Sequence, residues 1–135
     1  MRWAHVRANT IKKFSQEELA NIELFKGQAF FGRLLCLSRG QVVPVHKHEH
    51  KDECFDVVEG NGTLLVDGRE LAGEPGTTLF VPAGVEHGLR ADGTDQWLVR
   101  ETVSERVYAR RALTMVLRAG LKRLPLVGAR WQNAQ

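Results

Sequence analysis

Three histidines fall within five residues of this 135-residue chain, at positions 46, 48 and 50, and Glu53 follows shortly after them. On an extended strand, the side chains of His46 and His48 leave the same face, with Cα atoms about 6.6–6.8 Å apart. Two imidazoles at that spacing can bind a single ion. Between them and Glu53 lies a short polar stretch that can turn the chain into the next strand. A complete site needs one more nitrogen donor from elsewhere in the sequence.

The best candidate for that donor is His87, which follows the turn sequence Pro82-Ala83-Gly84 and begins a predicted strand. In a small barrel, strands that are distant in sequence face each other across the interior, so His87 could meet the first cluster. Three neutral imidazoles and one carboxylate suit a divalent transition metal: Fe, Mn, Ni, Co, Cu or Zn. On an octahedral ion, four protein ligands leave two positions for a bidentate substrate, or for a substrate and O₂.

Short apolar segments alternate with turns about every ten residues, which predicts the scaffold that must position these side chains. Asp67-Gly68 is typical of a two-residue hairpin, and Pro44 marks its segment as an edge or irregular strand. With no long helix between the segments, the pattern predicts an all-β antiparallel sandwich or small barrel. The predicted strands are 30–37, 41–48, 54–58, 63–66, 69–71, 77–81, 87–90 and 96–99.

The two ends of the chain differ from this pattern. Residues 15–18 and 102–105 each have the form of a capping box, which predicts a turn or two of helix after the first. After the second, apolar residues recur at helical spacing and predict an amphipathic helix over about 103–119. We therefore expect a barrel with an N-terminal extension over 1–101 and a C-terminal helical tail over 102–135.

The same two parts of the chain also differ in net charge. Residues 1–99 hold 11 basic and 14 acidic side chains, whereas residues 100–135 hold eight basic and two acidic ones. The basic tail could contact an anionic membrane surface, but we favour a helix packed on the barrel or on a dimer mate. No nucleic-acid-binding motif is present. Two cysteines without a disulfide framework, and the lack of an apolar leader or membrane span, predict a cytoplasmic protein.

Two runs of residues resemble the paired motifs of the cupin family. The first is Gly40, five residues, His46, Lys47, His48, four residues, Glu53, six residues, Gly60. The second is Gly76, five residues, Pro82, Ala83, Gly84, two residues, His87. The second motif usually ends in asparagine where this chain has Ala91, but that asparagine is not a ligand.

The resemblance covers a motif core over 40–91 and implies a cupin jelly roll, a small antiparallel β-barrel that carries a metal inside. It implies one divalent transition metal, of undetermined identity, held by His46, His48, Glu53 and His87. It also implies a homodimer. We expect His50 to stand outside the ligand set.

Function is less determined than fold, because cupins include dioxygenases, isomerases, decarboxylases, sensors and storage proteins. Our hypothesis is a metal-binding cupin that binds or acts on a small molecule, as a metal-dependent dioxygenase or isomerase. The alternatives are a non-catalytic binding or sensing module and a purely structural metal. No catalytic residue is evident, although Glu53 could leave the ion and accept a proton.

The walls of the pocket follow from strand alternation. Phe55 and Val57 share the inward parity of Glu53 and should line the pocket around the ion. Arg33 and Trp97 could reach the cavity and bind an anionic or aromatic substrate, although core or surface positions are commoner for such residues. These four residues are the pocket candidates: Phe55, Val57, Arg33 and Trp97.

Overall fold

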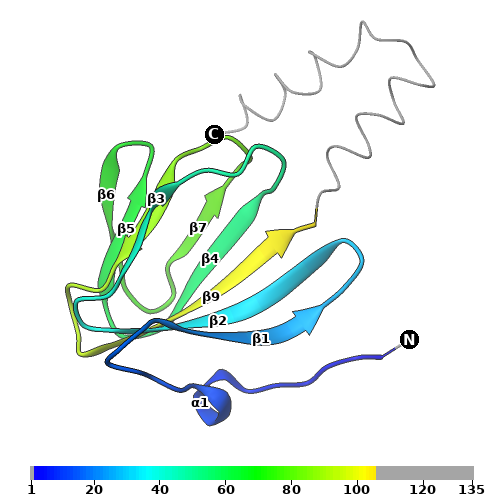
Figure 1. The fold of residues 1–135 in the computed structure, drawn as a ribbon, viewed down its shortest axis with the longest axis horizontal. Helices are drawn as coiled ribbons and strands as arrows, with labels where there is room; N and C mark the ends of the chain where they lie inside the picture. The colour runs from blue at the N-terminus through cyan, green and yellow to red at the C-terminus, as the bar shows by residue number, and fades with distance from the viewer. Residues whose placement is uncertain (1, 106–135) are drawn as a thin grey trace, which may run out of the picture.

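The computed structural model describes residues 2–105, which form two antiparallel β-sheets that face each other (Figure 1). One sheet has the strand order β1-β2-β9-β4-β7 and the other has the order β3-β8-β5-β6. The strands are β1 (Ala20–Lys26), β2 (Phe30–Ser38), β3 (Val42–His46), β4 (Glu53–Glu59), β5 (Gly62–Val66), β6 (Arg69–Gly73), β7 (Thr78–Val81), β8 (His87–Arg90) and β9 (Gln96–Ser104). The predicted all-β antiparallel fold is confirmed.

Two local predictions can be compared directly with the backbone. Asp67 and Gly68 both have positive φ, 49° and 74°, as a two-residue turn between β5 and β6 requires. Pro44 lies in β3, which is an edge strand, and the pairing of β3 with β8 shifts register between Val43 and His46. Proline has no N–H to donate to a neighbouring strand, so this edge position and the irregular pairing follow from its chemistry.

Strand β9 is the centre of the larger sheet, because it pairs with β2 over its whole length and with β4 on its other side. Its inward-facing residues contribute Trp97 and Val99 to the core between the sheets, where they meet Leu37 from β2 and Leu64 from β5. The core thus draws on both sheets, and alternation along β9 decides which of its side chains enter it.

Trp97 is fully buried in this core, and its indole N–H donates a hydrogen bond to the carbonyl of Gly73 at 3.1 Å. Gly62 and Gly73 leave room for the ring: a Cβ at either position would lie 2.5–2.6 Å from its carbon atoms. The prediction that Trp97 reaches a substrate cavity is therefore wrong. Its ring is enclosed by β5 and β6 at the end of β9 where that strand begins.

The N-terminal segment covers the outer face of the larger sheet, where Leu34, Cys36 and Leu98 form a second buried cluster. Helix α1 (Ala8–Ile11) lies beside β1 and β2 in Figure 1, and Ala8 and Ile11 pack against that cluster. The helix predicted after residues 15–18 is absent from the described chain, which bends there instead. The Glu17 N–H donates to Ser15 Oγ, and β1 begins soon after because its residues pair with β2.

At its other end, β9 continues through Ser104, so the prediction that a helix starts at about 103 is wrong. Val103 pairs with Phe31 in β2 and with Glu53 in β4, and Ser104 exchanges two hydrogen bonds with the backbone of Asp52. These cross-strand partners outweigh the local capping pattern. Nearly all of the predicted helix and tail lies outside the described residues. No helix in the described part of the chain is long and apolar enough to cross a membrane.

Candidate metal centre

The structure brings His46, His48, Glu53 and His87 together, with one donor atom from each residue lying within 4.8 Å of all the others. Glu53 Oε1 is 3.1 Å from His48 Nε2, and Glu53 Oε2 is 2.5 Å from His87 Nε2. The imidazole centroids of His46 and His87 are 4.5 Å apart. His50 is exposed and stands outside this group, as expected.

Strand pairing explains how residues so far apart in sequence meet. His46 at the end of β3 is the direct cross-strand partner of His87 at the start of β8. Gly88 allows the two strands to approach here, because a Cβ on it would lie 2.7 Å from the carbonyl oxygen of Val43. Glu53 comes from the facing sheet, where it begins β4. The cluster therefore joins the two sheets at one end of the sandwich.

The loop that carries His48 is fastened to the turn before β8. The Gly84 N–H donates to the carbonyl of His48 at 2.8 Å, and the Ala83 N–H donates to Asp52 Oδ1 at 2.9 Å. Burial raises the pKa of Asp52, and the bond from Ala83 offsets only part of that rise. Both ends of the loop are therefore held against the residues that lead into His87.

Backbone carbonyls determine which ring nitrogens face the centre of the cluster. His46 Nδ1 lies 2.7 Å from the carbonyl of Pro44, and His87 Nδ1 lies 2.9 Å from the carbonyl of Val85. A carbonyl can only accept, so each Nδ1 must donate, and in the neutral ring each Nε2 then presents a lone pair. Such hydrogen bonds orient metal-binding histidines in proteins.

Two of the inward-facing atoms need a positive group between them. When His87 is neutral and its Nδ1 donates to Val85, Glu53 Oε2 and His87 Nε2 are both buried with no proton between them, although they lie 2.5 Å apart. Two lone pairs that face each other so closely repel unless a proton or a metal ion lies between them. The donor set, three imidazoles and a carboxylate, fits a divalent transition metal.

The pKa shifts agree with this arrangement. Burial alone would lower the pKa of His87, but hydrogen bonds to Glu53 and Val85 raise it above its usual value. Burial alone would raise the pKa of Glu53, but the three histidines lower it. Burial lowers the pKa of His48, and the charge of Glu53 offsets this only in part. In the metal-free protein these shifts favour an ionised Glu53 beside a protonated His87.

Glu101 is a second buried carboxylate that was not predicted from the sequence. It lies on the inner face of β9 between Arg33 and Phe55, its cross-strand neighbours, and is 5% exposed. Arg33 Nε lies 2.8 Å from Glu101 Oε2, and a second nitrogen lies 3.3 Å from Oε1. Burial raises the pKa of Glu101, and Arg33 offsets part of the rise. The predicted strand ended at Val99, and extending its alternation by two residues would have found Glu101.

The other pocket candidates divide into two groups. Phe55 lies beside the cluster, with its ring centroid 5.7 Å from that of His87, and Val57 is buried one inward position further along β4. Arg33 faces inward beside Glu101, whereas Trp97 lies at the opposite end of β9. The open side of the cluster is at His46 and His48, which are partly exposed, whereas Glu53 and His87 are almost completely covered.

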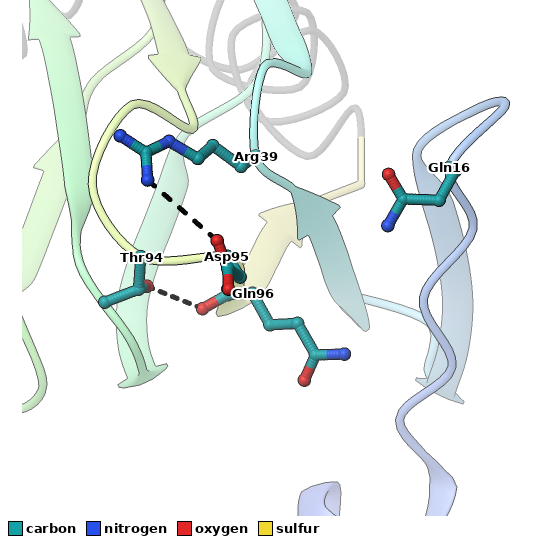
Figure 2. Close-up of a pocket in the computed structure, with 5 residues that line it drawn as sticks. All are labelled: Gln16, Arg39, Thr94, Asp95 and Gln96. Atoms are coloured by element: carbon teal, nitrogen blue, oxygen red, sulfur yellow. Dashed lines mark hydrogen bonds and ion pairs between the residues drawn. The ribbon is translucent and has the colours of Figure 1, made fainter.

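A separate hollow of about 570 Å³ lies near the start of β9, and Figure 2 shows its lining residues. They are Gln16, Arg39, Thr94, Asp95 and Gln96. The Arg39–Asp95 ion pair in this hollow spans 3.9 Å between side chains that are 63% and 94% exposed. This hollow gathers no buried titratable groups, so the histidine cluster is the stronger candidate site.

Comparison with protein families agrees with the geometry. Residues 33–99 match the model of the cupin domain. Over 54 residues the chain is 39% identical to quercetin 2,3-dioxygenase from Bacillus subtilis (strain 168). That match covers 40% of this chain and 16% of the relative, so the chain spans only a small part of that protein.

Several solved structures share the fold. The TT1209 protein of Thermus thermophilus is 26% identical, with a TM-score of 0.72 over 76% of this chain and 97% of that one. An RmlC-like cupin from Desulfovibrio desulfuricans is 24% identical, with a TM-score of 0.67 over 77% of this chain and 97% of that one. KdgF from Halomonas sp. is 23% identical, with a TM-score of 0.62 over 68% of this chain and 84% of that one.

Proposed function

This chain belongs to the cupin superfamily, and from that premise we propose that it binds one divalent transition metal and uses it to transform a small molecule, as a dioxygenase. The proposed ligands are His46, His48, Glu53 and His87. The observation that carries the proposal is the convergence of their donor atoms within 4.8 Å, around two buried atoms that lack a hydrogen-bond donor.

A divalent ion at this position would supply Lewis acidity toward a chelating oxygen and a place to bring O₂ beside it. The protein residues have simpler tasks. The carbonyls of Pro44 and Val85 hold the rings of His46 and His87 with Nε2 facing inward. Phe55 covers His87 and excludes water from that side, so a ligand would approach from the exposed side of His48.

Proton transfer would fall to a carboxylate. Glu53 would be the acceptor, because its carboxylate could leave the ion and take a proton from a bound substrate. In the metal-free protein the histidines lower the pKa of Glu53, so the carboxylate is ionised and can accept a hydrogen bond from a substrate hydroxyl. A dioxygenase is favoured over an isomerase because the relative that matches 54 residues of this chain is named quercetin 2,3-dioxygenase.

The alternative is a binding or sensing module in which the same pocket holds a small ligand without turnover. The cluster itself does not distinguish an enzyme from a binding module, since both would hold the metal with the same four residues. Oxygen consumption and product formation separate the two. They should be measured on a panel of flavonols, catechols, diketones and sugars with the Fe(II), Mn(II) and Ni(II) forms compared.

Metal content should be determined first, by elemental analysis of protein from its native host. We expect close to one transition metal per chain, followed by oxygen uptake with at least one member of the panel. Ligand binding without oxygen uptake or product would favour the sensing module. A chain that binds none of the six candidate metals would contradict both.

Three further proposals rest on the family resemblance and the composition alone. We propose a homodimer, which light scattering coupled to gel filtration would test, and a cytoplasmic location, which fractionation would test. The basic residues after Arg100 all lie outside the described chain, so packing of the tail on the barrel or on a dimer mate stays a prediction. Binding of the intact protein to anionic vesicles would contradict it.

A further inference from the structure

We propose that Arg33, held in place by Glu101, binds an anionic group of the ligand. The pocket would then take a small organic acid that has a metal-chelating head and a second acid group at its other end. This inference rests on the proposed function, because the chelating head requires the metal.

Register places Arg33 on the same side of the larger sheet as the cluster. Arg33, Glu101 and Phe55 are direct cross-strand partners on β2, β9 and β4. Adjacent strands are about 4.8 Å apart, so the Cα atoms of Arg33 and Phe55 are separated by roughly 10 Å. The ring of Phe55 in turn lies 5.7 Å from that of His87. Phe55 therefore lies between the cluster and the strands that carry Glu101 and Arg33.

The guanidinium of Arg33 keeps donors available for a ligand. Glu101 receives hydrogen bonds from Nε and one terminal nitrogen, and a guanidinium carries five N–H groups. The Arg33 side chain is 34% exposed, whereas that of Glu101 is only 6% exposed. One edge of the guanidinium is therefore fixed inside the protein, and the other faces solvent, where an acid group can reach it.

The charges around the pocket also favour an anion. Arg33 and Lys51 both lie over the ring of Phe31, at 5.3 and 5.9 Å from its centroid. In the part of the chain that the structure describes, Lys51 forms no ion pair. Glu53, Asp52 and Glu101 are the acidic groups near the cluster, and two of them balance these two cations. A divalent ion would then leave the pocket with a net positive charge.

Packing alone does not account for the Arg33–Glu101 pair. Val99 and Val103 flank Glu101 on the same face of β9, and both are buried apolar side chains. Burying the carboxylate of Glu101 costs desolvation free energy that its pair with the partly exposed Arg33 must offset, and apolar residues of similar volume often stabilise a fold as well or better. The pair is more readily explained by a ligand that binds the free edge of the Arg33 guanidinium. In this view Glu101 is a positioning residue and Arg33 binds the ligand.

The test compares two acids that share a chelating head and a chain length. 2-Oxoglutarate carries a second carboxylate, whereas 2-oxopentanoate ends in a methyl group. Their affinities for the metal-loaded full chain should be measured by calorimetry, after the metal stoichiometry has been determined for each variant. We expect the protein to prefer 2-oxoglutarate by about tenfold, as one charge-assisted pair would provide.

The Arg33→Gln variant should bind both acids about equally. The matched control is Arg100→Gln, which removes an arginine from the neighbouring strand whose side chain points outward toward Asp56, and it should keep the tenfold preference. Glu101→Gln should lower the preference severalfold while leaving metal stoichiometry and 2-oxopentanoate affinity unchanged. A purely structural role for Glu101 would instead change both affinities together.

Three results would overturn the proposal: no preference in the unaltered protein, binding of neither acid, or a preference that survives Arg33→Gln. If Arg33→Gln fails to fold, the preference of the unaltered protein for 2-oxoglutarate still tests the proposal. Arg33→Lys is then a milder substitution, which should retain part of that preference. Failure to bind metal would contradict both the proposed function and this inference. One metal per chain with equal affinity for the two acids would contradict this inference alone.

Discussion

The two ends of β9 are built for different purposes. Where the strand begins, Trp97 is enclosed by apolar side chains and two glycines, and its one polar atom is hydrogen-bonded to Gly73. Where the strand ends, Glu101 faces the interior and Val103 pairs with Glu53, whose carboxylate meets His87 without a donor between them. The first end is packed and fully satisfied, whereas the second is polar and incomplete.

This difference indicates where the free energy of folding comes from. Burying a large aromatic side chain stabilises a fold by several kcal/mol, whereas a buried polar atom without a partner costs about 1–3 kcal/mol. The Trp97 end can therefore offset the cost of the cluster at the other end. Changes at the Trp97 end should lower the free energy of unfolding and leave metal binding nearly intact, and changes at the cluster should do the reverse. Four experiments test this separation.

The largest effect is expected at the cluster. Replacing both His46 and His48 with alanine removes two of the four donors, so bound metal should fall from close to one per chain to almost none. Elemental analysis after dialysis measures this. The free energy of unfolding of the metal-free protein should change little, because both side chains are partly exposed. Full retention of metal by the variant would contradict the assignment of these ligands.

At the opposite end, Trp97→Ala should lower the free energy of unfolding by about 3–5 kcal/mol, since it leaves a large cavity in the core. Denaturant titration measures this loss. The folded fraction should still bind one metal per chain, because Trp97 does not reach the cluster. If folded Trp97→Ala protein had lost its metal affinity, the two ends would be coupled.

A smaller and more specific effect is expected at Gly73. An alanine there would place its Cβ 2.6 Å from a carbon of the Trp97 ring, so overpacking should cost about 1–3 kcal/mol. In a Trp97→Leu background the same substitution should cost much less, because the ring is gone. A double-mutant cycle measures this coupling. Equal costs in the two backgrounds would show that the ring is not what Gly73 accommodates.

The smallest expected effect is a difference in pH dependence. The raised pKa of His87 stabilises the metal-free protein when His87 is protonated, and this contribution is lost as pH rises through that pKa. The lowered pKa of Glu53 contributes stability that is lost as pH falls through it. The pair should therefore stabilise the metal-free protein most at mildly acidic pH, between the ordinary values of 4.5 and 6.5.

In the pH range where His87 loses its proton, metal affinity should rise with pH while the stability of the metal-free protein falls. The reason is that the ion competes with that proton for Nε2. Affinity should rise with pH there and fall below about pH 6. Thermal melts of the metal-free protein and metal titrations over pH 5–8 measure the two slopes. Metal occupancy that stays flat across this range would count against a three-histidine site.

Much of this arrangement could be predicted from residue types and spacing. The turn at Asp67-Gly68 and the edge strand at Pro44 follow from the backbone chemistry of single residues. Alternation within β4 placed Phe55 and Val57 inward, where the structure has them. Each of these predictions depends on interactions within a few residues.

The errors occurred where pairing between distant strands decided the outcome. The capping pattern after Thr102 is a valid local signal, but pairing of Val103 with β2 and β4 extends the strand instead. That extension is also why Glu101 was missed, since it lies beyond the predicted end of the strand. Trp97 was misplaced because nothing local to it indicates that Gly62 and Gly73 leave a space for its ring.

Residue types and their spacing were therefore enough to identify the four candidate ligands and the antiparallel scaffold, because motif spacing and strand periodicity are local properties. The folded chain was needed to learn that Nε2 of His46 and His87 faces the centre, and that Arg33 and Glu101 stand beside them. Those facts depend on which carbonyl or carboxylate a folded neighbour presents. Such contacts arise from the register of strands that are dozens of residues apart.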